Sequence, residues 1–174
     1  MLIKILDKEF RPYISSERLA QEIKRLAQEV EQQMQGKRPL FISILNGSFM
    51  FASDFIRAYQ GECEVAFVRF SSYQGMETTH QVKQLLGLPK DIAGREVVVI
   101  EDIVDTGNTL EEIYNLFADK QVASLRIMTL FFKPEAYKKD LPIHHIGFSI
   151  PNRFIVGYGL DYDELWTAKY QGAG

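Results

Sequence analysis

The chain has 174 residues and a net charge of −3; 46% of its residues are hydrophobic and 25% are charged. This balance is typical of a globular protein and excludes a disordered one. The length predicts a single domain across residues 1–174 with a full core. The small negative charge gives no general support for binding nucleic acid or a membrane surface, so we expect neither partner.

Cysteine content and the N-terminal sequence indicate the compartment. Cys63 is the only cysteine, which excludes an internal disulfide and a multi-cysteine zinc site. We expect it to be a small buried apolar residue. The N-terminus lacks the apolar core of a signal peptide, and no segment approaches the length needed to span a bilayer. We therefore expect a cytoplasmic protein.

The first part of the chain predicts helices that alternate with strands. Ser15 and Ser16, followed by Glu17, are placed to cap a helix in which apolar residues recur at helical spacing from Leu19 to Met34. The next elements are a strand at residues 40–45, a tight loop at Asn46 and Gly47, a helix at residues 48–59 and a strand at residues 65–70. Residues 71–86 then form a polar stretch too long for a minimal connection. We favour a lid there, and a weakly structured hairpin is the alternative.

The run at residues 97–110 is the most informative part of the sequence. Four consecutive β-branched apolar residues, 97–100, predict a strand buried on both faces, as in a parallel sheet covered by helices. Ligands bind at the carboxyl ends of such strands. Residues 105–109 then form a small, hydroxyl-rich loop that leads into a helix ending near Phe117. Backbone N–H groups at such a helix start, with threonine hydroxyls and a glycine, form a cradle for phosphate.

Two carboxylates in this run conflict with a plain phosphate site. Glu101 and Asp102 would repel a phosphate dianion, but they suit a ligand that also carries vicinal hydroxyls or a magnesium ion. The alternative is that both are solvated loop residues and that Thr109 is only a helix cap. The run is neither a Walker A sequence nor G-x-G-x-x-G, so kinases and dinucleotide-binding proteins lose their best support.

The last part of the chain predicts one more strand and then an irregular cap. A strand is expected at residues 124–132, so that strands separated by helices give an α/β fold with a mostly parallel sheet. From Lys133 onward the chain is rich in proline, glycine and aromatic residues, which is typical of an irregular cap over one sheet edge.

Residues 97–110 resemble the phosphoribosyl-pyrophosphate motif of the type I phosphoribosyltransferases: a hydrophobic strand, two acids, then Asp-Thr-Gly-x-Thr. Within that family the segment from Glu101 to Gly107 looks most like the hypoxanthine-guanine branch. The resemblance extends from the helix at Ser15 to Tyr162. It implies the type I phosphoribosyltransferase fold, a mostly parallel central sheet flanked by helices, with a lid at about 71–86 and a small irregular hood formed mainly by residues 133–174.

The resemblance also implies an activity. The family branch is a purine-salvage transferase that joins hypoxanthine or guanine to phosphoribosyl pyrophosphate, giving IMP or GMP and pyrophosphate. Mg²⁺ would neutralise the departing pyrophosphate. Asp105 would act as the general base that takes the proton from purine N7. Enzymes of this family are commonly homodimers or homotetramers.

Site residues follow from the same resemblance. Those expected to bind phosphoribosyl pyrophosphate or nucleotide are Glu101, Asp102, Ile103, Asp105, Thr106, Gly107, Asn108, Thr109, Asn46, Gly47, Ser72 and Tyr73. Those expected to bind the purine are Lys133 through the 6-oxo group, Phe154 by stacking, Ile155 through its backbone, and Asp161. Glu101, Asp102 and Asp161 are the expected magnesium residues.

Each distant residue also has a structural interpretation. In this alternative, Lys133 is a solvated strand end, Phe154 is a core residue and Asp161 is a turn residue. The three histidines lie outside the motifs, and we expect them to be structural or surface residues: His80, His144 and His145.

The chain departs from the family pattern at the pyrophosphate end. Asn46 stands where the family often has lysine or arginine beside a non-proline cis peptide, and Thr167 stands near the place of a frequent arginine, for which Lys169 is a candidate substitute. Two alternatives stay open: a transferase for xanthine or a pyrimidine, and an RNA-binding nucleotide sensor on the same fold. Lys133 and Phe154 favour a purine, and the acidic composition gives little support to RNA binding.

Overall fold

The computed structural model describes residues 2–70 and 84–161. Its helices are α1 (Ser16–Gln33), α2 (Phe49–Ala58) and α3 (Asn108–Phe117). Its strands are β1 (Ile3–Ile5), β2 (Lys8–Phe10), β3 (Leu40–Leu45), β4 (Glu64–Phe70), β5 (Gln84–Leu86), β6 (Glu96–Val104), β7 (Ser124–Phe132) and β8 (His145–Ser149). The predicted helices and strands are all present, and their bounds agree to within a few residues.

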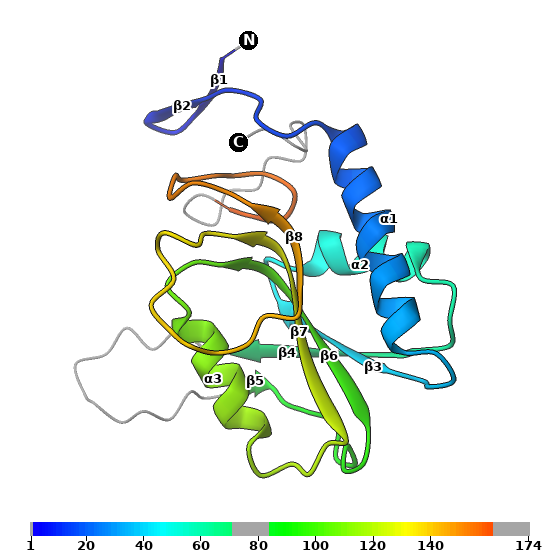
Figure 1. Cartoon of the computed structure of the whole chain (residues 1–174). Coiled ribbons are helices and arrows are strands. Elements are labelled where there is room, and N and C mark those ends of the chain that lie inside the picture. The colour runs from blue at the N-terminus through cyan, green and yellow to red at the C-terminus, as the bar shows by residue number, and fades with distance from the viewer. Residues whose placement is uncertain (1, 71–83, 162–174) are drawn as a thin grey trace, which may run out of the picture.

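The central sheet has the strand order β5-β4-β3-β6-β7-β8, and β1 and β2 form a separate antiparallel hairpin (Figure 1). Every pair from β4 to β8 is parallel, whereas β5 runs antiparallel to β4 at one edge. The mostly parallel sheet predicted from the sequence is therefore confirmed. Because β3 and β6 are neighbours at its centre, the loops that follow them meet at the same sheet edge.

Helices cover both faces of the sheet, with α1 and α2 on one side and α3 on the other (Figure 1). Side chains alternate along β6: Val98 and Ile100 join the cluster beneath α1 and α2, while Val97 and Val99 join the one beneath α3. All of these side chains are fully buried. This two-sided burial confirms the prediction made from the apolar run, because a solvated face would require polar residues at every second position.

Helix α1 begins where the sequence predicts. The Ser15 hydroxyl accepts a hydrogen bond from Arg18 N at 3.2 Å, which satisfies one of the free N–H groups of the first turn. The buried stripe follows helical spacing and consists of Leu19, Ile23, Leu26, Ala27 and Val30. The chain leaves the helix after Met34, and Gly36 adopts a φ of +74°.

Three observations differ from the expectations or fall outside them. β8 lies within the segment expected to be irregular, between Pro142 and Pro151. Cys63 is half-buried rather than buried, and burial raises the pKa of its thiol, so the thiolate is disfavoured. Within the expected lid, β5 is described, whereas residues 71–83, which include Ser72, Tyr73 and His80, lie outside the described residues.

Across the described part of the chain, no helix is long and apolar enough to cross a membrane.

Candidate active site

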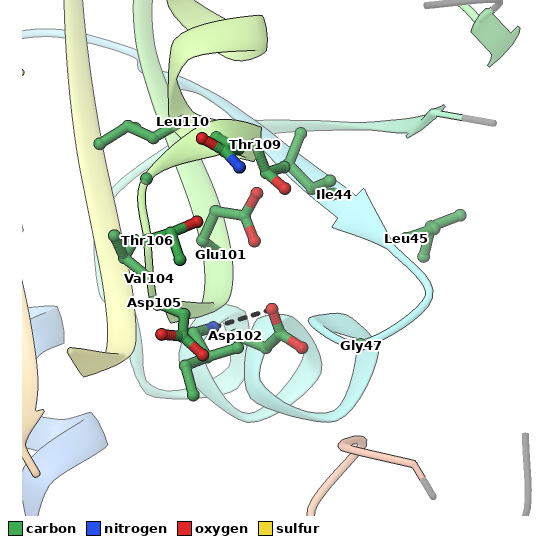
Figure 2. Close-up of a pocket in the computed structure, with 13 residues that line it drawn as sticks. Ile44, Leu45, Gly47, Glu101, Asp102, Val104, Asp105, Thr106, Thr109 and Leu110 are labelled. Carbon is green, nitrogen blue, oxygen red and sulfur yellow. Dashed lines mark hydrogen bonds between the residues drawn. The ribbon is translucent and has the colours of Figure 1, made fainter. Parts of the chain in front are cut away.

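A cavity of about 320 Å³ lies at the carboxyl ends of β3 and β6, beside the start of α3 (Figure 2). It is lined by Ile44, Leu45 and Gly47 and by every residue from 101 to 110. The structure thus brings the residues of the predicted phosphoribosyl motif together with Gly47 of the β3–α2 loop. Asn46 precedes Gly47 but is not among the lining residues described, and its side chain is exposed.

The start of α3 supplies the expected anion-binding turn. Gly107 is the residue that caps the helix and has a φ of +95°, a conformation that side chains rarely adopt. The first helical bond runs from Glu111 N to Gly107 O at 3.0 Å, so the preceding N–H groups have no partner within the helix. Thr109 lies inside the helix, and its interpretation as a mere helix cap is wrong. The positive end of α3 therefore faces the cavity.

Glu101 and Asp102 lie within β6 rather than in a loop after it. Glu101 is only 4% exposed, which rules out a solvated loop residue. Burial raises its pKa well above the usual range, and the neighbouring Asp102 charge raises it further. Burial also raises the pKa of Asp102, whose Oδ1 accepts a hydrogen bond from Ile103 N at 2.8 Å. In Figure 2, Glu101 lies between Thr106 and Ile44, with Asp102 nearer to Gly47.

These carboxylates fit a cation or hydroxyl donors. Within the described residues, Glu101 Oε1 is buried without a hydrogen-bond partner, and such an atom is costly unless a ligand satisfies it. Besides burial, the charge of Asp161 raises the pKa of Asp102. No group of three or more acidic, histidine or cysteine side chains in the described part could hold a metal by itself. Magnesium would therefore take its remaining ligands from substrate and water, as it commonly does.

Lys133 forms a pair with Asp105, which lines the cavity. Lys133 Nζ lies 3.3 Å from Asp105 Oδ2, and the side chains are 7% and 48% exposed. Lys133 N also donates to Val104 O at 3.0 Å, which holds the end of β7 against β6. Lys133 is thus not a solvated strand end. The pair presents a hydrogen-bond donor and an acceptor side by side.

The β3–α2 loop is packed tightly against the Asp102 carboxylate. A Cβ atom at Gly47 would overlap Asp102 Oδ2, and one at Gly159 would overlap Gly47 O. The Leu45–Asn46 peptide is cis, as the family resemblance implies. Ser48 is fully buried, and its hydroxyl donates to Ile44 O and contacts Ser43 Oγ. Sequence reasoning missed both serines, although two serines within an apolar strand and its loop were a visible signal.

The structure does not bring Phe154 and Ile155 into the same cavity. They line a second cavity of about 550 Å³ between the β1–β2 hairpin and the segment after β8. Phe154 is 51% exposed, with Lys8 Nζ 5.1 Å from its ring centroid, so its interpretation as a core residue is wrong. An exposed ring at this place is available for stacking.

His144 and His145 are structural, as expected. His145 is buried, donates from Nδ1 to Glu29 Oε1 at 2.5 Å and accepts from Arg126 Nε at 3.1 Å. Burial lowers its pKa, which favours the neutral ring. His144 Nδ1 accepts from Ile127 N at 2.8 Å. Both rings therefore join elements of the fold and lie outside the described lining of the cavity.

Residues 13–163 match the model of the phosphoribosyl transferase domain family, a span that contains the whole cavity. The chain belongs to this family. The membership inferred from residues 97–110 is confirmed.

Named relatives of this phosphoribosyl transferase domain agree with the family match. The chain is 43% identical over 132 residues to a hypoxanthine phosphoribosyltransferase from Salmonella typhimurium, covering 75% of this chain and 74% of the relative. It is 36% identical over 164 residues to a hypoxanthine-guanine phosphoribosyltransferase from Streptococcus thermophilus, covering 93% and 91%. A crystal structure of a hypoxanthine-guanine phosphoribosyltransferase from Bacillus anthracis superposes with a TM-score of 0.82 at 40% identity, covering 89% and 92%.

Proposed function

We propose that this phosphoribosyltransferase joins hypoxanthine or guanine to phosphoribosyl pyrophosphate in purine salvage. The observation that carries the proposal is the pairing of Lys133 with Asp105, a residue that lines the phosphate and carboxylate cavity. A 6-oxopurine protonated at N7 presents an acceptor, O6, next to a donor, N7–H, which complements this pair. The 6-amino group of adenine would instead point a donor at the Lys133 ammonium. The relatives named for hypoxanthine and guanine support the same substrate class.

The phosphoribosyl group fits the rest of the cavity. Residues 106–109 hold its 5′-phosphate at the start of α3. Glu101 and Asp102 accept hydrogen bonds from the ribose hydroxyls, which would satisfy the buried Glu101 oxygen. Mg²⁺ would be held by Glu101 and Asp102, with the charge of Asp161 acting on Asp102, and would supply Lewis-acid assistance to the pyrophosphate leaving group.

The chemical step needs no covalent enzyme intermediate. The bond from C1′ to the pyrophosphate oxygen breaks and a bond from C1′ to purine N9 forms. Asp105 takes the N7 proton, and its carboxylate stabilises the positive charge that develops on the sugar. Lys133 holds O6 while Phe154 stacks on the purine and the Ile155 backbone contacts its edge. The exposed Phe154 ring supports this role, although in the structure it lines the second cavity rather than the one at the carboxyl ends of β3 and β6.

A base panel tests the proposal. Phosphoribosyl pyrophosphate and Mg²⁺ are offered with hypoxanthine, guanine, xanthine, adenine and uracil in parallel, and release of pyrophosphate is measured. We expect turnover with hypoxanthine, guanine or both, and none with adenine or uracil. Preference for xanthine or uracil would support the alternative transferases. No turnover with any base, together with RNA binding in a titration, would overturn the enzymatic proposal in favour of a sensor.

A further inference from the structure

The segment that follows β7 lies behind the anion-binding turn. We call residues 134–141 the brace segment. Lys138 N donates to Thr106 O at 3.0 Å. A Cβ atom at Gly107 would lie 2.7 Å from Tyr137 Cε2 and 2.7 Å from Lys139 Cγ, so the tyrosine ring and the lysine stem rest directly on the glycine backbone. Neither side chain is among the residues described as lining the cavity. The turn is therefore in contact with two side chains that lie outside the described lining of the cavity.

Tyr137 is fixed in this place by several contacts. Its hydroxyl donates to Leu141 O at 2.7 Å and accepts from Leu141 N at 3.1 Å. Its ring packs edge-on against Phe132, with 5.4 Å between ring centroids. Its backbone N–H donates to Lys133 O at 3.2 Å. A half-buried ring held at both ends has little freedom, so it is a rigid support for Gly107.

Lys139 adds an electrostatic contact. Its Nζ lies 2.7 Å from Glu111 Oε2, and the side chains are 27% and 51% exposed. Glu111 stands in the first turn of α3, where its charge stabilises the helix but repels a bound phosphate. The Lys139 ammonium offsets that repulsion. Because the pair is exposed, its effect on anion affinity is expected to be modest.

We propose that Tyr137 and Lys139 are positioning residues for the phosphate-binding turn. The tyrosine ring and the lysine stem hold Gly107 in its left-handed conformation, and the lysine ammonium neutralises Glu111 beside the anion. The inference rests on the proposed function, because it takes the anion to be the 5′-phosphate of phosphoribosyl pyrophosphate.

The ring is tested by Tyr137→Leu and Tyr137→Phe. Loss of the ring should raise KM for phosphoribosyl pyrophosphate about tenfold, since small displacements of a binding group are costly, and leave KM for hypoxanthine within about twofold. Tyr137→Phe keeps the ring but loses its two hydrogen bonds to Leu141, so its KM for phosphoribosyl pyrophosphate should lie between those of the parent protein and Tyr137→Leu. A Tyr137→Leu variant with an unchanged KM for phosphoribosyl pyrophosphate, or with equal losses for both substrates, overturns the role of the ring.

The role of the Lys139 ammonium is tested by a variant that removes the charge but keeps an apolar side chain of similar length. Lys139→Met should raise KM for phosphoribosyl pyrophosphate about threefold, and adding Glu111→Gln should restore most of the loss. Lys138→Met is the matched control: it removes the same charge from an exposed neighbour and should leave KM unchanged. Equal effects of Lys138→Met and Lys139→Met, or no rescue by Glu111→Gln, would overturn the electrostatic part. The comparison of Lys139→Met with Lys138→Met still tests the proposal if Tyr137→Leu fails to fold.

Failure of the inference and failure of the proposed function are distinguishable. If the parent protein turns over no base, the proposed function is wrong, and calorimetric binding of phosphoribosyl pyrophosphate replaces KM as the measurement. Unchanged dissociation constants in the Tyr137→Leu and Lys139→Met variants would then overturn the inference. If the parent protein is active and these variants keep its KM, only the inference is wrong.

Discussion

The two ends of the candidate site are built differently. The phosphate end is assembled from one continuous run, residues 101–110, with its turn supported from behind by the brace segment. The expected purine end depends on Phe154 and Ile155, which line a separate cavity, and on Lys133, which does reach Asp105. The residues of the phosphate end thus line a single cavity, whereas those of the expected purine end do not share one. The phosphate end is therefore the more preorganised of the two, and preorganisation favours affinity.

Asp105 lies where the two ends meet, and its replacement should have the largest effect. Asp105→Asn keeps the shape but removes the proton acceptor, so kcat should fall by about 10²–10⁴-fold while both KM values change little. Single-turnover kinetics with hypoxanthine measure this loss. An unchanged kcat would exclude the general-base role. An increase in KM for one substrate with kcat unchanged would instead make Asp105 a binding residue of the phosphate end or of the purine end.

Lys133 tests whether the purine end is selective. Lys133→Ala should raise KM for hypoxanthine about 30-fold, because O6 loses a charged donor, and leave KM for phosphoribosyl pyrophosphate nearly unchanged. Steady-state kinetics with each substrate varied in turn separate the two effects. Lys138→Ala is the control for loss of a nearby positive charge. Equal losses for both substrates would mean that Lys133 holds the whole site together and that the two ends are not independent.

Phe154 tests whether the exposed ring takes part in binding. Phe154→Leu should raise KM for the base about fivefold to tenfold through lost stacking, with little change in the thermal unfolding temperature because the ring is half exposed. Kinetics and a thermal melt check both statements. A large drop in unfolding temperature with unchanged KM would assign Phe154 to the packing against the β1–β2 hairpin instead.

Glu101 gives the smallest expected effect, a pH dependence of stability at the phosphate end. Because its pKa is raised in the folded state, folding favours the protonated form, so stability is greatest at low pH and falls as pH rises through the elevated pKa. Glu101→Gln should therefore raise the unfolding temperature at neutral pH by a few degrees and flatten its pH dependence. Thermal melts across pH measure this. An unchanged slope would mean that the buried carboxylate is satisfied without ligand.

Much of the fold was predictable because its signals are local. The cap at Ser15, the helical stripe of α1 and the two-sided apolar run of β6 each follow from neighbouring residues. β8 was missed because its five residues lie between two prolines in a segment whose composition indicates loops. Its place in the sheet comes from pairing with β7, which no local pattern encodes.

The candidate site was predictable where it is continuous. The acids and the turn at residues 101–109 were found from their order alone, and the structure places them around one cavity. The burial of Glu101 and of Lys133 depends on tertiary packing, so the sequence left solvated alternatives open for both. Tyr137 gave no signal at all, because its contact with Gly107 joins segments that only the fold brings together.

The contact between Gly47 and Asp102 limits how this protein can change. At that corner the Asp102 side chain lies against Gly47 and the Gly47 backbone lies against Gly159, so neither glycine can accept a side chain without displacing a neighbour. Natural variation or directed evolution therefore cannot tune the corner by substituting these glycines. The exposed side chain of Asn46, one residue earlier, is the position where charge could be introduced without disturbing the wall of the cavity.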